Sequence, residues 1–172
     1  MENINSSNSI MLLATRFDNL GGWTVEQQFV LQMGSSYLLA HGIGTPITDD
    51  PTTKVKVEKA GKYRLWVRTK NWTAFWSEGK TPGIFQVKVD GVADAAEFGL
   101  GCPGETRAER AVWYWQKGGE YDLSEGEHEI ALHDIMGSEY CMIGHSHLPE
   151  VSNRLSAVPD PSICTVVLLG FV

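Results

Sequence analysis

Apolar and polar residues alternate through the middle of the chain, and this pattern predicts β-strands. The alternation is clearest at residues 54–58, 63–69 and 85–89. Because successive side chains of a strand point to opposite faces, one face of each run is expected to pack in a core. The second run carries two sets of side chains: Tyr63, Leu65 and Val67 on one face, and Arg64, Trp66 and Arg68 on the other.

Turn residues separate these runs. A turn is expected at residues 60–62, and Asp90-Gly91 is a strong hairpin signal after the third run. Residues 113–116 are expected to form a strand that is followed by a turn at residues 117–119.

The last part of the chain contains further strand signals. Residues 121–123 lead into a turn at 124–126, and His128, Ile130 and Leu132 then follow at a period of two. Residues 163–169 form a nearly continuous apolar run, which predicts a strand buried on both faces, in the core or against a partner.

Three segments have weaker patterns. Residues 24–33 fit a strand, which we favour, although Val25, Phe29 and Met33 are also spaced four apart as in a helix. Residues 107–112 could form one or two helical turns, and the prolines of residues 149–162 indicate a long loop.

Short strands separated by turns, without alternation of strands and helices, predict an all-β protein. We expect an antiparallel β-sandwich. Residues 11–172 are expected to form a single β-sandwich domain with a long loop at about 149–162. Residues 1–10 are expected to be a lead that is disordered or foreign to the native protein.

Charge and composition exclude several classes of partner. The chain has 14 Lys and Arg residues against 21 Asp and Glu residues, a net charge of −7, and shows no basic stripe. Nucleic acid is therefore not an expected partner. No apolar run reaches the roughly 20 residues of a membrane-spanning helix, so no membrane partner is expected. The three cysteines are an odd count, which is not typical of a disulfide framework.

The sequence supplies no convincing catalytic constellation. Residues 99–104 match the G-x-G-x-x-G pattern, but the strand and helix of a dinucleotide site are not predicted around them. Carboxylate pairs such as Asp94 with Glu97 are interpreted as solvated charges. We therefore predict no catalytic residue and no cofactor.

Histidines late in the chain leave an enzymatic alternative open. His145 and His147 would share one face of a strand, and a third ligand would have to come from His133, Asp134 or Cys141. With His133, the set would suit a small metal-dependent hydrolase or lyase. Their spacing matches no known ligand pattern, so they are interpreted as surface or loop residues and no metal is predicted.

Three aromatic residues follow the strand at residues 63–69 and form the main candidate site. Trp72, Phe75 and Trp76 lie within five residues of one another in a segment that is punctuated like a loop. Core aromatics of a strand should recur at every second position, and these do not. Loop aromatics on a rigid sheet present flat apolar faces to a ligand. The alternative is that they plug one end of the sandwich.

A second aromatic group and a polar rim complete the candidate site. Trp113 and Trp115 would share one face of a strand, where they could serve either the core or a platform. Sugar binding uses such rings for stacking and polar side chains for the hydroxyl groups. The rim candidates lie near predicted strand ends: Arg68, Asn71, His41 and Asp134.

The order of these motifs resembles the carbohydrate-binding-module jelly rolls of the galactose-binding-like type. The resemblance is carried by residues 61–68, 85–91 and 123–132. A closer similarity, over roughly residues 11–145, is to the β-sandwich domain C-terminal to bacterial FAD-dependent oxidoreductases, sometimes labelled xanthan-lyase-like. It is carried by residues 21–23, 27–29, 33–42, 66–72, 82–87 and 115–119.

This resemblance implies a non-catalytic accessory domain, secreted or periplasmic, that recognises a polysaccharide or packs against a neighbouring catalytic domain. It does not imply FAD binding, because the similarity does not include a flavin domain. Residues 13–18 lack the acidic pair with which many such modules hold structural calcium, so a calcium site is not predicted.

We predict that Trp72→Ala or Trp76→Ala abolishes retention by a glycan in affinity electrophoresis, because each removes one flat apolar face. Circular dichroism should show that the fold is intact. Wild-type retention of both variants would contradict a platform at these two residues.

Overall fold

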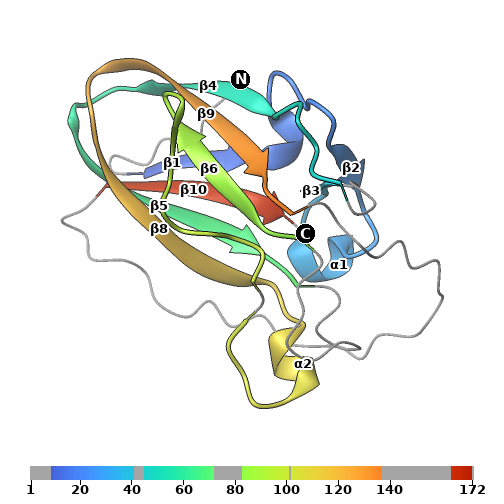
Figure 1. Ribbon diagram of the computed structural model, residues 1–172. Helices are drawn as coiled ribbons and strands as arrows, with labels where there is room; N and C mark the ends of the chain where they lie inside the picture. Colours follow the sequence, from blue (N-terminus) through green and yellow to red (C-terminus); the bar gives the residue numbers. More distant parts are fainter. Residues whose placement is uncertain (1–8, 41–44, 72–82, 101, 137–163, 172) are drawn as a thin grey trace.

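The computed structural model describes residues 9–40, 45–71, 83–100, 102–136 and 164–171, and for the last range only the course of the backbone. The strands form two sheets (Figure 1). In sheet A the order is β2 (Thr24–Glu26), β3 (Tyr37–Leu39), β10 (Cys164–Phe171), β5 (Gly61–Thr69) and β8 (Tyr114–Leu123), and β1 (Ser9–Leu13) also pairs with β10. In sheet B the order is β4 (Thr52–Val57), β9 (Gly126–Asp134), β6 (Phe85–Val89) and β7 (Val92–Ala93).

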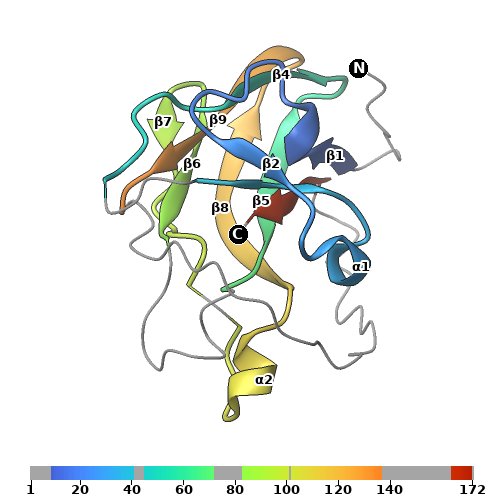
Figure 2. The ribbon, with the colours of Figure 1, turned by 90° about the vertical axis from the view of Figure 1, so that its right-hand side faces the viewer.

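The described helices are short: η1 (Ala14–Arg16), α1 (Val30–Met33) and α2 (Arg107–Arg110). Figure 2 looks toward β2 and α1, and places α2 at the far lower end of the molecule. The helix expected near residue 107 is confirmed. It begins at a capping box, in which Thr106 and Glu109 each accept a hydrogen bond from the other's backbone N–H.

The predicted all-β sandwich is confirmed, and most of its strand pairs are antiparallel. Strand β10 departs from that pattern, because it runs parallel to β1, β3 and β5. It lies between β1 and β5 (Figure 1), so the final apolar run has strand partners on both edges. The jelly-roll connection remains a prediction.

Two boundaries differ from the expected ones. Strand β1 begins at Ser9, two residues before the expected start of the domain, and Ile10 is buried in the core. Residues 24–33 contain both expected structures in succession, the strand β2 and then α1. The helix ends at Gly34, which at φ 88° adopts the left-handed conformation. The expected long loop at 149–162 lies outside the described residues.

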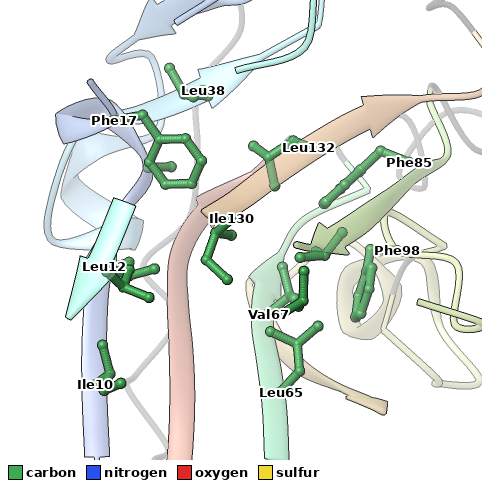
Figure 3. Close-up of a cluster of buried hydrophobic side chains, with 14 of the residues drawn as sticks. Ile10, Leu12, Phe17, Leu38, Leu65, Val67, Phe85, Phe98, Ile130 and Leu132 are labelled. Carbon is green, nitrogen blue, oxygen red and sulfur yellow. The ribbon is translucent and has the colours of Figure 1, made fainter. Parts of the chain in front are cut away.

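The core lies between the two sheets and confirms the alternation of β5. The side chains of Leu65 and Val67 on β5 point to sheet B, where Ile130 and Leu132 lie (Figure 3). Val87 of β6 belongs to the same buried cluster. The hairpin signal is also confirmed, since Asp90 and Gly91 have φ angles of 50° and 79° in the turn between β6 and β7.

A buried carboxylate joins the two sheets at one edge. Asp94 follows β7 of sheet B and is 4% exposed, so its interpretation as a solvated charge is wrong. Its Oδ2 accepts hydrogen bonds from the Gly119 N–H at 2.7 Å and the Tyr121 hydroxyl at 2.5 Å, both on β8 of sheet A. Its Oδ1 accepts the Ala96 N–H at 2.8 Å.

The two glycines of β8 make room for this carboxylate. A Cβ atom on Gly118 would lie 2.9 Å from Asp94 Oδ2 and 2.9 Å from a methyl carbon of Leu65. The turn expected at residues 117–119 is therefore wrong, because β8 continues through them with a register shift opposite Leu65. Such a bulge lets a strand bend while remaining in the sheet.

We predict that Asp94→Asn lowers the free energy of unfolding by about 2 kcal/mol, because the amide nitrogen cannot accept the hydrogen bonds that one carboxylate oxygen accepted. Urea unfolding measures the change. Asp122→Asn, an exposed substitution on the same strand, should change it by less than about 0.5 kcal/mol. Equal losses in the two variants would refute the role of Asp94.

Candidate functional site

The outer face of β5 and β8, turned away from the core, carries two tryptophans beside two cations. In the strand register, Trp66 lies opposite Lys117 and Arg68 lies opposite Trp115. Residues paired across antiparallel strands share a face, so the four side chains form one group, which we call the outer quartet. Lys117 is exposed, and the other three are partly exposed.

Arg68 connects the outer quartet to α1. Its Nη1 donates a hydrogen bond to the Met33 carbonyl at 3.2 Å, and its guanidinium carbon lies 5.9 Å from the centre of the Trp115 ring. This is cation–π range. Burial lowers the pKa of Arg68 below its usual value, but a guanidinium remains charged at neutral pH.

Lys70 lies beyond the end of β5 and is 5% exposed. Its ammonium group donates to Gln32 Oε1 at 3.0 Å and to the Ala111 carbonyl, and lies 4.7 Å from the centre of the Phe29 ring. Burial lowers the pKa of Lys70 to about 8, so the group is still mostly charged at pH 7.

An aromatic cluster fills the space between α1 and this end of sheet A. The Tyr37 ring lies 6.2 Å from Phe29 and 5.1 Å from Trp113. The Tyr37 hydroxyl accepts the Phe29 N–H at 3.2 Å, and burial raises its pKa to about 12. Trp113 thus packs against this second apolar cluster, whereas Trp115 remains on the outer face.

The other predicted site residues are distributed differently. Trp72, Phe75, Trp76 and His41 lie outside the described residues. Asn71 is 3% exposed, which does not suit an exposed rim donor.

Asp134 lies on the other sheet, away from the outer quartet. It is 3% exposed, and it accepts the Ile47 N–H at 3.0 Å and the Met136 N–H at 3.2 Å. These hydrogen bonds anchor two loops, so the role of Asp134 is structural.

The sequence reasoning did not select Trp66, Lys70 or Lys117. The alternation at residues 63–69 already placed Trp66 beside Arg68, and that was the available signal. Lys117 was missed because the Gly-Gly pair after it indicated a turn. Only the pairing of β5 with β8 places it opposite Trp66.

A Ser–His–Asp arrangement joins the turn between β6 and β7 to the turn between β8 and β9. His128 Nδ1 lies 2.6 Å from Asp90 Oδ2, and its Nε2 lies 2.9 Å from the Ser124 carbonyl and 3.4 Å from Ser124 Oγ. The hydrogen bond between His128 and Asp90 raises the pKa of His128, and the hydrogen bond to the Ser124 carbonyl raises it further. A ring that donates from both nitrogens has no lone pair for a base, so these contacts fit a structural link.

His133, the described member of the proposed metal set, binds a carboxylate. Its Nδ1 lies 3.0 Å from Asp50 Oδ1, and Lys88 Nζ lies 2.8 Å from Asp50 Oδ2. No group of three possible metal ligands occurs within the described part of the chain. His145 and His147 lie outside it.

No protein-family model and no curated protein matches this sequence. Among the described residues, no helix has the length and apolar character needed to cross a membrane.

The burial of Lys70 predicts a pH-dependent stability. Its pKa is about 8 in the folded protein and about 10.4 when unfolded, so protonation favours the unfolded chain. The free energy of unfolding of wild type relative to Lys70→Met should therefore rise by about 2 kcal/mol from pH 7 to pH 10. Urea unfolding at both pH values tests this, and a pH-independent difference would exclude a depressed pKa.

Proposed function

We propose that this protein is a non-catalytic carbohydrate-binding module that holds a polysaccharide on the outer face of β5 and β8. The observation that carries the proposal is the outer quartet, in which Trp66 and Trp115 share one face with two cations. Trp72, Phe75 and Trp76, which follow β5 in the chain, remain predicted binding residues.

The backbone beneath the outer quartet is held in place by the core. Leu65 and Val67, which alternate with Trp66 and Arg68 along β5, are 1% and 0% exposed. A rigid strand presents an aromatic ring with little loss of conformational freedom on binding. The ring faces can then stack on the apolar face of a sugar, while Arg68 and Lys117 bind its oxygen atoms.

An accessory role follows from the expected affinity. A surface with two rings binds a single glycan segment weakly, but linkage to an enzyme raises its effective concentration at the polymer. The proposal includes the secreted or periplasmic location and the neighbouring catalytic domain that the jelly-roll resemblance implies.

A second candidate function is structural, and exposed apolar residues favour it. Leu31 on α1 is 99% exposed, and Val25 on β2 and Val30 on α1 are 42% and 37% exposed. Exposed apolar side chains that lie close together are typical of protein contacts. In this reading, the β2–α1 surface packs against a catalytic domain and the protein retains no glycan.

We predict that Trp115→Ala weakens binding to a retained polysaccharide about tenfold or more, because it removes a stacking face worth about 1.4 kcal/mol. Affinity electrophoresis on a panel of neutral and acidic polysaccharides measures this. Trp115→Tyr, which keeps a ring, should restore part of the retention.

Leu31→Ala is the matched control, since it removes an exposed apolar side chain outside the outer quartet. It should leave retention unchanged, and thermal unfolding should confirm that both variants fold. Wild-type retention of Trp115→Ala would refute the outer quartet as the site. Absence of retention of wild type on every polysaccharide would refute glycan binding and favour the structural function.

A further inference from the structure

Three cations at one end of the outer face form no ion pair with a carboxylate among the described residues. Within the described part of the chain, Arg68 and Lys70 donate hydrogen bonds to neutral oxygens, those of Met33, Gln32 and Ala111. Lys117, the exposed member of the outer quartet, makes no ion pair within the described part of the chain. Among the described residues, positive charge therefore accumulates here with no ion pair, although the charge of Glu120 also interacts with Lys117.

The other end of the same two strands is arranged in the opposite way. Arg64 Nε donates to Glu120 Oε1 at 3.1 Å, and Lys62 Nζ lies 3.8 Å from Glu120 Oε2. One carboxylate thus serves both cations of that end. Within the described face, cations that form no ion pair lie beside tryptophans only at the end that carries the outer quartet.

This concentration of positive charge runs against the overall composition. The chain has a net charge of −7, with 21 acidic residues available as partners. Burial of a charge without an opposite charge is unfavourable, and both Arg68 and Lys70 lose solvation here. Such unpaired cations create a positive potential that attracts anions to the surface.

We propose that the outer quartet recognises an anionic polysaccharide, with charged carboxylate or sulfate groups on the sugar rings. This inference rests on the proposed function and adds the class of glycan. Trp66 and Trp115 stack on the sugars, and Arg68 and Lys117 bind the anionic groups with charge-assisted hydrogen bonds. Lys70 is too buried for contact and contributes its charge from beneath the surface.

The test compares charged polymers with matched uncharged ones, using the whole chain. The probes are polygalacturonate and its full methyl ester for carboxylate, and dextran sulfate and dextran for sulfate. Isothermal titration calorimetry should show that at least one charged polymer binds about fivefold or more tightly than its uncharged partner. Raising NaCl from roughly 50 mM to roughly 500 mM should reduce that difference, because salt screens exposed charges.

Lys117→Gln is the diagnostic variant, and Lys56→Gln is its control. Both remove one exposed positive charge, but Lys56 lies on β4 of sheet B. Lys117→Gln should weaken binding to the charged polymer up to about fivefold and leave the uncharged polymer unaffected, whereas Lys56→Gln should change neither. Since both positions are exposed, neither change should impair folding.

The outcomes separate this inference from the proposed function. Equal binding of charged and uncharged polymers overturns the inference and leaves glycan binding in place. Equal effects of the two lysine variants overturn the assignment to the outer quartet. Binding of single-stranded DNA as tightly as the preferred polysaccharide also overturns it, because the surface would then select charge alone. No binding to any polymer refutes glycan binding itself.

Discussion

The Asp94 carboxylate is the interaction on which the arrangement of this sandwich depends. It lies after the edge strand of sheet B and accepts two hydrogen bonds from β8, the edge strand of sheet A. Buried polar groups are hydrogen-bonded, and here both carboxylate oxygens accept hydrogen bonds, from Gly119, Tyr121 and Ala96. The two sheets are thereby held at a set distance along this edge.

The same constraint shapes the surface on the other side of β8. Because Gly118 and Gly119 face the carboxylate, the strand bulges opposite Leu65 and the register shifts. Beyond the bulge, Lys117 pairs with Trp66 and Trp115 pairs with Arg68. A residue larger than glycine at 118 would meet Leu65 and Asp94, so the bulge and the outer quartet depend on one local feature.

A second carboxylate acts similarly near the other edge of sheet B. Asp18 Oδ2 accepts the Thr53 hydroxyl at 2.8 Å and the Lys54 N–H at 3.1 Å, which connects the segment after η1 to β4. The Lys54 N–H and then the Thr53 hydroxyl lower the pKa of Asp18. The sandwich therefore uses hydrogen-bonded carboxylates where its sheet edges meet loops, and apolar packing between them.

The alternation of apolar and polar residues was sufficient to predict β4, β5, β6 and the Asp90-Gly91 hairpin, because a two-residue period leaves one face for the core. It also placed Trp66 and Arg68 together on the outer face. The parallel pairing of β10, the continuation of β8 through its glycines and the burial of Asp94 depended on contacts between residues far apart in the chain. Local sequence carries no record of such partners, so only the tertiary structure decided which of the described cations form no ion pair and which tryptophans lie beside them.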